Sequence, residues 1–162
     1  IGDKSYDVAF IQSVDGVISI IEQDTIVNSV EIYEMLLPGC LAYIDRKDYL
    51  IISNPAYEIE CYSYNNLATS KGKKSDTKIF HNWIINLGEL AKDIQVLTNT
   101  LTKKQEILVM TETMIHLLSD NGHILFQKKL DYESIAMRIY NIEDKNYQQN
   151  KIPPRGEIES VR

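Results

Sequence analysis

Two distant stretches of the chain share one form, an apolar run followed by a turn signal and a second run rich in large apolar residues. In the later stretch, Met114 to Ser119 is followed by Asp120-Asn121-Gly122 and then by Ile124 to Lys129. In the earlier stretch, Val8 to Glu22, the turn signal is Val14-Asp15-Gly16. Asp, Asn and Gly can supply the positive φ angles that tight hairpin turns need. Each stretch therefore predicts an antiparallel β-hairpin.

The two predicted hairpins have definite strand pairs. We expect Met114–Ser119 to pair with Ile124–Lys129, and Val8–Ser13 to pair with Val17–Glu22. Two hairpins of the same form, separated by further short strands, indicate a repeated four-stranded antiparallel unit. This pattern is typical of an all-β protein, and in particular of a β-propeller.

Further strands are predicted between and after the hairpins. Tyr49–Ser53 is apolar throughout, as expected of a strand that is buried on both faces. Grouped along the chain, the strands form sets of three, four and four, spaced by roughly fifty residues, which is near the range of propeller repeats. The sequence predicts roughly three four-stranded blades and requires no helix. A helical turn at Leu87–Lys92 is the one alternative, and Gly88 argues against a longer helix there. The additional strand predictions are Val27–Met35, Leu41–Ile44, Glu58–Tyr64, Ile79–Asn86, Ile94–Thr98, Ile107–Thr111 and Ser134–Ile142.

Two polar segments interrupt or follow this pattern. Asn65–Thr77 is rich in lysine and predicts a long exposed loop, with a basic docking patch as the alternative. Residues 143–162, with Pro153-Pro154, predict a polar loop or linker. Three blades do not close a propeller, which typically has four to eight. Because the chain also begins with Ile1 rather than Met, we expect it to be part of a longer protein.

The composition excludes some classes of partner. Seventeen Lys and Arg residues against 23 Asp and Glu give a formal net charge of −6, so nucleic acid and anionic membrane surfaces are poor partners for the chain as a whole. No apolar run approaches the ~20 residues of a membrane span, so direct membrane insertion is not expected. Cys40 and Cys61 predict two reduced, buried thiols, with a disulfide as the alternative.

The residues that could carry chemistry are few and scattered. No P-loop, G-x-S-x-G or H-E-x-x-H motif is present. Turn formation accounts for Asp120-Asn121-Gly122 without a calcium ion, because the further carboxylates of an EF-hand loop are missing. We therefore predict no catalytic residue, no metal and no cofactor. His116 is predicted to be a core residue, and His81 and His123 are too scattered to form a zinc site with it. Asp131 and Glu133 are predicted to cap a turn rather than to act as an acid–base pair, and Trp83 is predicted to pack between blades.

Five segments occur in an order that matches a known family. They are FIQSVDGVISIIEQ, MLLPGCLAY, IECYSY, WIINLGELAKDI and LLSDNGHILFQKKLDY. Together they resemble the amino-terminal β-propeller of the Bardet–Biedl syndrome protein nine family, over roughly Asp7 to Tyr132. The chain departs from the family pattern in Asn65–Thr77 and after Tyr140. The resemblance implies that residues 1–142 are part of an amino-terminal β-propeller.

The resemblance also implies a function. Members of this family are non-catalytic scaffold subunits of the BBSome, a coat-like complex that moves membrane proteins to and from cilia. The implied partners are other BBSome subunits with helical-repeat and propeller folds, and indirectly ciliary membrane cargo and a small GTPase. The implied location is the cytoplasm, the ciliary base and the cilium. An interaction propeller of another coat or trafficking complex stays open as the alternative, and a propeller enzyme is a third class. No residue is assigned to partner binding.

Overall fold

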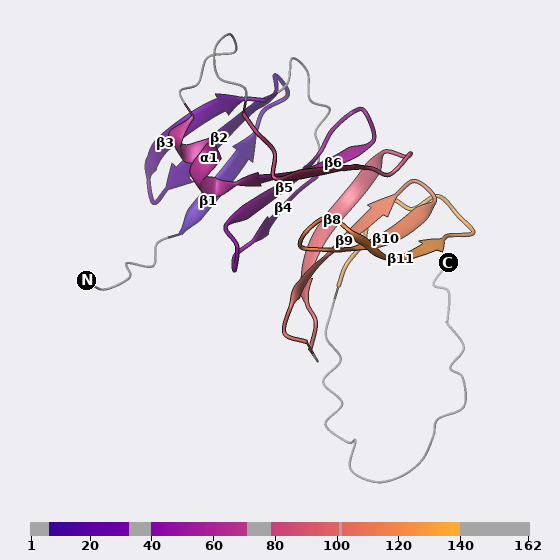
Figure 1. Cartoon of the computed structure of the whole chain (residues 1–162). Coiled ribbons are helices and arrows are strands. Elements are labelled where there is room, and N and C mark those ends of the chain that lie inside the picture. Colours follow the sequence, from indigo (N-terminus) through magenta and orange to yellow (C-terminus); the bar gives the residue numbers. More distant parts are fainter. Residues whose placement is uncertain (1–6, 33–39, 71–78, 101, 140–162) are drawn as a thin grey trace.

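The computed structural model describes residues 7–32, 40–70, 79–100 and 102–139. Three antiparallel β-sheets follow one another along the chain, and each contacts the next (Figure 1). The first sheet has the order β1-β2-β3, the second β4-β5-β6-β7 and the third β11-β10-β9-β8. The strands are β1 (Val8–Gln12), β2 (Val17–Glu22), β3 (Thr25–Glu31), β4 (Leu41–Ile44), β5 (Tyr49–Ser53), β6 (Glu58–Ser63), β7 (Trp83–Asn86), β8 (Ala91–Thr98), β9 (Gln105–Thr111), β10 (Met114–Ser119) and β11 (Ile124–Lys129).

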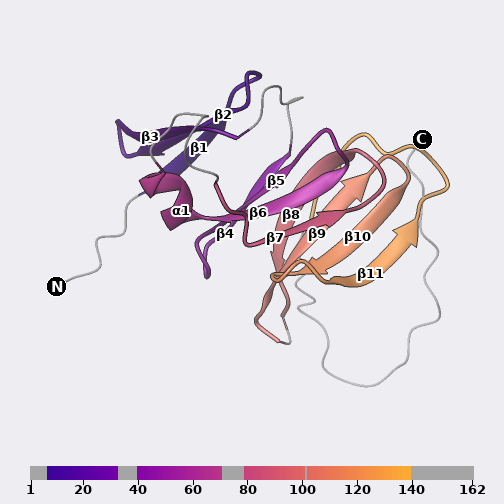
Figure 2. The ribbon, with the colours of Figure 1, turned by 45° about the horizontal axis from the view of Figure 1, so that its top comes forward.

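Both hairpins predicted from the turn residues are confirmed. β1 pairs with β2 in a register that places Val8 opposite Glu22, and β10 pairs with β11 with Met114 opposite Lys129. Gly16 and Gly122 have φ angles of 83° and 79°, which are the positive values that their turns require. The predicted grouping into sets of three, four and four strands is also confirmed. Figure 2 shows β8 to β11 side by side in sequence order.

The prediction that the chain needs no helix is wrong. Helix α1 (Tyr64–Thr69) occupies the first part of the segment that was predicted as the loop Asn65–Thr77. The hydroxyl of Ser63 caps the helix by accepting a hydrogen bond from Asn66 N, and Leu67 is fully buried. The side-chain amide of Asn28 on β3 donates to the carbonyl oxygens of Leu67 and Ser70 at 2.7 and 2.8 Å. Tertiary contacts therefore stabilise a helix that is too short to be stable alone.

One alternative is excluded and one further strand prediction needs correction. Leu87–Lys92 forms no helical turn, because Gly88 has a φ of 79° and β8 begins at Ala91. The described part of Ser134–Ile142, residues 134–139, is not a strand. This segment runs beside β8 through side-chain contacts: Gln95 Nε2 donates to the carbonyl of Met137, and Ile139 N donates to Gln95 Oε1. The predictions for 33–39, 71–77 and 140–162, including the linker at 143–162, lie outside the described residues.

The second sheet is the centre of the described structure, and both of its faces are buried. One face packs on the third sheet, where Ile51 and Cys61 belong to the same apolar cluster as Ile107 and Val109. The other face packs on the first sheet and on α1, in a second cluster (Ile18, Ile20, Val30, Leu50, Ile52, Tyr62 and Leu67). The prediction that Tyr49–Ser53 is buried on both faces is therefore confirmed.

The first sheet lacks a counterpart to β4 and β8, which are the first strands of their own sheets and are in contact with each other. The carboxylate of Glu22, at the end of β2, accepts a hydrogen bond from Tyr64, and Tyr64 N donates to Asp48 O in the β4–β5 turn. The β2–β3 turn therefore lies at the same end as the β4–β5 turn, and β1 runs opposite to β4 (Figure 1). By direction, β1 corresponds to β5 rather than to β4. The strand that would pair with the free edge of β1, in the position that β4 and β8 have in their sheets, is not among the described residues.

Candidate interaction surface

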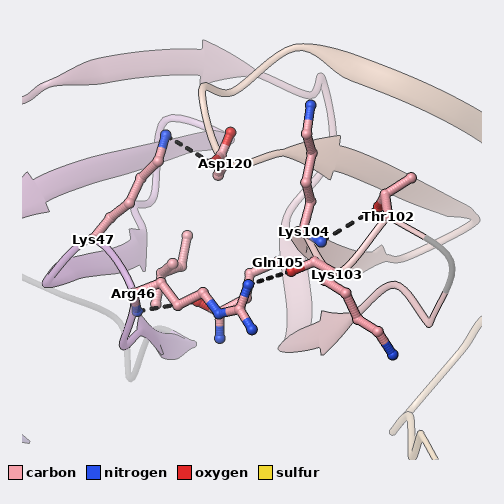
Figure 3. A pocket seen from close by; sticks show the side chains of 8 residues that line it. Arg46, Lys47, Thr102, Lys103, Lys104, Gln105 and Asp120 are labelled. Carbon is pink, nitrogen blue, oxygen red and sulfur yellow. Dashed lines mark hydrogen bonds and ion pairs between the residues drawn. The ribbon is translucent and has the colours of Figure 1, made fainter.

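A basic pocket lies where turns of the second and third sheets meet. The β4–β5 turn contributes Arg46 and Lys47, and the β8–β9 loop contributes Lys103 and Lys104 (Figure 3). The pocket has a volume of about 280 Å³, and its lining includes Ile44 and Asp120. A second hollow of about 390 Å³ shares Lys104 and Asp120 with it and continues toward the β10–β11 turn. We call the first hollow the basic pocket and the two together the basic groove.

Hydrogen bonds between the two sheets hold the loops of the basic pocket in place. Gln105, which is 9% exposed, accepts a hydrogen bond from Arg46 N at 3.2 Å and donates to Asp45 Oδ1 at 2.8 Å. The guanidinium of Arg46 donates to the carbonyl oxygen of Lys103. The hydrogen bond from Gln105 lowers the pKa of Asp45, because it favours the ionised carboxylate. Arg46 is thus fixed by contacts with residues far away in sequence.

The charges of the basic pocket are only partly balanced. Lys47 Nζ lies 2.7 Å from Asp120 Oδ2 and 3.2 Å from Asn121 Oδ1. Within the described part of the chain, Arg46, Lys103 and Lys104 have no ion pair with a carboxylate. The pocket is therefore lined by four cations and one carboxylate, Asp120, in a chain whose net charge is −6, and the charge of Arg46 also acts on Asp45 next to it.

Trp83 positions the β10–β11 turn that forms one side of the groove. Its indole Nε1 donates to the carbonyl oxygen of Asp120 at 3.1 Å. The ring also lies directly under Gly122, where a Cβ would be 2.6 Å from Trp83 Cε3. Trp83 packs against the apolar cluster between the second and third sheets. It is therefore a packing residue, as predicted, and it fixes Asp120 for the ion pair with Lys47.

A second polar cluster lies around Glu89, in the connection from β7 to β8. Its carboxylate accepts hydrogen bonds from Thr111 Oγ1 at 2.7 Å, from Thr113 N at 2.8 Å and from Thr113 Oγ1 at 2.5 Å. These bonds, the one from Thr111 first, lower the pKa of Glu89. His116 is 2% exposed, and its Nδ1 lies 3.1 Å from the side-chain amide of Gln127. Burial lowers the pKa of His116, and the charge of Glu89 opposes this effect.

Acidification is expected to destabilise the fold through His116. The pKa of His116 is lower in the folded chain than its ordinary value of 6.5, so the unfolded chain takes up the proton first as the pH falls. The contribution of neutral His116 is fully present above pH 6.5 and is lost as the pH falls toward the folded pKa. We expect urea midpoints to fall between pH 7.5 and 5.5 in the wild type, and to fall less in His116→Gln. An equal fall in both proteins would contradict this role of His116.

The other residues that the sequence raised as candidates do not converge on a site. His81, His123, Asp131 and Glu133 are exposed, and only Asp131 and Glu133 are near one another in sequence, in the segment after β11. Among the described residues, no group of three or more His, Cys, Asp or Glu side chains could hold a metal ion. Within the same residues, no helix is long and apolar enough to cross a membrane.

Both cysteines are free thiols. Cys61 is fully buried and Cys40 is half-buried. Burial raises the pKa of Cys61 to about 12, and it also raises the pKa of Cys40. A thiol with a raised pKa is a poor nucleophile at neutral pH, because the thiolate is the reactive form. The alternative of a disulfide between Cys40 and Cys61 is not formed in the structure.

The basic pocket is not among the sites that the sequence predicts. No role is assigned from the sequence to the basic pairs Arg46-Lys47 and Lys103-Lys104. Each pair follows the first strand of its sheet, β4 in one case and β8 in the other. Equivalent turns of neighbouring propeller blades lie side by side at one end of the ring. The recurrence of a basic pair at one position of the repeat was therefore a usable signal.

The fold defines the class of protein. Consecutive antiparallel sheets of short strands, with β4 and β8 in contact, are blades of a β-propeller. Solved structures agree: BBS1N in complex with ARL6DN has a TM-score of 0.64 at 9% identity, over 82% of this chain and 38% of that chain. Sqt1 of Saccharomyces cerevisiae has a TM-score of 0.62 at 10% identity, over 88% of this chain and 37% of that chain. The chain is part of a β-propeller.

The chain belongs to the PTHB1 N-terminal family, whose model matches residues 1–155. It is 32% identical to Protein PTHB1 of Homo sapiens over 142 residues, which are 81% of this chain and 16% of the human protein. It is 30% identical to Protein PTHB1 of Xenopus laevis over 151 residues, which are 86% of this chain and 18% of the frog protein. PTHB1 is Bardet–Biedl syndrome protein nine, so the predicted resemblance is confirmed. The chain spans less than a fifth of the length of these relatives.

Proposed function

We propose that this chain is part of a non-catalytic scaffold subunit of a BBSome-type complex, which traffics membrane proteins to and from cilia. Family membership and the BBS1N neighbour support a propeller subunit of this kind. We further propose that residues 1–142 are part of the propeller and that residues 143–162 are a linker. The proposed location is the cytoplasm, the ciliary base and the cilium, peripheral to the membrane.

The observation that carries the proposal is that the stack of three sheets has two open outer faces with apolar side chains. On the first sheet, Phe10 packs toward the second sheet, so its neighbour Ile11 points away and is 53% exposed. On the third sheet, Leu118 packs toward the second sheet, while Leu117 faces the other way, paired with Phe126, which is 53% exposed. Exposed apolar patches of this kind mark surfaces that are covered in the working protein.

The edge of the first sheet is open as well. Among the described residues, β1 pairs only with β2, so one of its edges has unpaired backbone groups. Propellers close by completing such a blade with a strand from another part of the ring. We infer that further blades of the longer protein complete the ring. The closed ring then presents broad rigid faces to partners, which is what a scaffold subunit needs.

The partners in this proposal are other subunits, with indirect links to ciliary membrane cargo and to a small GTPase. BBS1N has been solved in complex with ARL6DN, which supports a small GTPase as a component of such an assembly. Interfaces between subunits are expected to place a few aromatic or aliphatic anchors inside a polar rim. The proposal assigns no reaction to the chain, and the names of its PTHB1 relatives give no enzymatic activity.

Deletion of this region from the full-length protein tests the proposal. In a ciliated cell, we expect the deleted protein to copurify less of the other BBSome subunits than the intact protein, with altered ciliary membrane composition. Subunits recovered by affinity purification and ciliary membrane proteins detected by immunofluorescence are the measurements. Re-expression of the intact protein is the control. Normal assembly together with normal ciliary membrane composition would refute the proposed function.

A further inference from the structure

We propose that the basic groove binds an extended acidic segment of a partner protein. The inference rests on the proposed function, because it names a surface through which the scaffold holds another subunit. Arg46, Lys103 and Lys104 line the basic pocket and form no ion pair with a carboxylate among the described residues, although the charge of Arg46 also acts on Asp45 next to it. A carboxylate from outside would balance these charges.

The floor and walls of the groove indicate what else the ligand carries. The lining of the basic pocket includes Ile44, which is fully buried, so the pocket is partly apolar. The adjoining hollow is lined by two carboxylates, Glu106 and Asp120, and also by Ser119, His123 and Leu125. Leu125 is 54% exposed, so the end of this hollow suits an apolar side chain rather than an acidic one. An extended peptide of a few residues could place an acidic side chain near Arg46 and an apolar side chain against Leu125.

The loops of the groove are already ordered for binding. The hydrogen bonds of Arg46 N with Gln105 and of the Arg46 guanidinium with the Lys103 carbonyl fix the two loops. Trp83 and the Lys47–Asp120 ion pair fix the third. A ligand therefore loses less binding free energy to loop ordering than it would on a flexible surface.

The charge of the chain favours an acidic polypeptide over a membrane or a nucleic acid. Large polyanions contact wide surfaces, and the chain outside the groove is acidic, with a total net charge of −6. A hollow of about 280 Å³ has room for one or two carboxylate side chains. A local group of cations in an acidic protein suits a partner whose negative charge is equally local.

Charge reversal in the full-length protein, expressed in ciliated cells, tests the inference. The test variant carries Arg46→Glu, Lys103→Glu and Lys104→Glu. The control variant carries Lys129→Glu and Arg138→Glu, which are exposed basic residues that line neither hollow and lie outside the Leu117–Phe126 face of the third sheet. We expect the test variant to retain about tenfold less of at least one subunit at physiological salt, because steering and pairing charges are reversed. The control variant should retain the wild-type amount.

A zero-length carbodiimide crosslinker provides an independent readout, since it joins lysine amines directly to carboxylates. In the wild-type complex, we expect crosslinks from Lys103 or Lys104 to Asp or Glu residues of a copurifying subunit. Wild-type retention by the test variant, or the absence of these crosslinks, would overturn the inference while leaving the proposed function intact. If the wild-type protein itself copurifies no subunit, both proposals fail.

Vesicles distinguish the alternative ligand. The purified wild-type and test proteins are sedimented with vesicles of phosphatidylcholine containing 0 or about 30% phosphatidylserine, at physiological salt, where surface attraction still acts within a Debye length. We expect no difference between the two proteins. Binding to the anionic vesicles that is lost in the test variant, with unchanged subunit retention, would assign the groove to a membrane surface and would overturn the inference.

Discussion

Gly122→Ala is expected to lower the free energy of unfolding by roughly 3 kcal/mol, from the sum of backbone strain and overpacking. The φ of Gly122 is 79°, a conformation that costs any residue with a Cβ about 1–2 kcal/mol. The added Cβ would also lie 2.6 and 2.7 Å from Cε3 and Cδ2 of Trp83. The indole is a rigid ring held by its hydrogen bond to Asp120 O, so it cannot move aside without losing that bond.

Gly88→Ala is the matched control for this prediction. Gly88 has the same φ of 79°, but no atom lies within 4 Å of the position of its added Cβ. Gly88→Ala should therefore lower the free energy of unfolding by the backbone strain alone, about 1–2 kcal/mol. Urea unfolding followed by fluorescence measures both variants, and Trp83 is the only tryptophan of the chain and lies at the site of the change. Equal losses in the two variants would show that Trp83 adapts and that the close packing under Gly122 has no energetic weight.

Ile51→Ala is expected to destabilise the fold by about 3–4 kcal/mol, within the range for buried isoleucine. Ile51 is fully buried in the cluster that joins the second and third sheets, opposite Cys61 on β6. Removing its side-chain atoms beyond Cβ leaves a cavity between two sheets that are rigid in their own planes, so the neighbours can fill it only in part. This is a large share of the 5–15 kcal/mol that stabilises a typical domain.

Ile84→Ala is the control for the core substitution. Ile84 lies on β7 of the same sheet, but it is 41% exposed. Ile84→Ala should lower the free energy of unfolding by less than about 1 kcal/mol, since the substitution returns little buried apolar surface to water. Urea midpoints of the two variants measure the difference. Similar midpoints would mean that the interface between the sheets contributes little to stability.

The strands were predictable because their signals are local. The alternation of side chains and the turn residues at Asp15-Gly16 and Asn121-Gly122 specify hairpins without reference to the rest of the chain. The uniformly apolar Tyr49–Ser53 specified a strand buried on both faces. Helix α1 was not predictable in this way, because its sequence, YNNLAT, has no amphipathic repeat. It exists because Leu67 is buried and Asn28, 39 residues earlier, binds its carbonyl groups.

The sequence by itself determined the blades, since each is built from neighbouring strands joined by short turns whose chemistry is written in a few adjacent residues. Only the tertiary structure decided where the blades meet. It brought Arg46 to Lys103, 57 positions away, and Trp83 to Asp120, 37 positions away. Contacts of this kind depend on how whole sheets pack face to face, and no local pattern encodes that packing. For this reason the fold could be predicted from the sequence. The repeated basic pair was a sequence signal for the groove, but only the packing of the sheets shows that the two pairs meet.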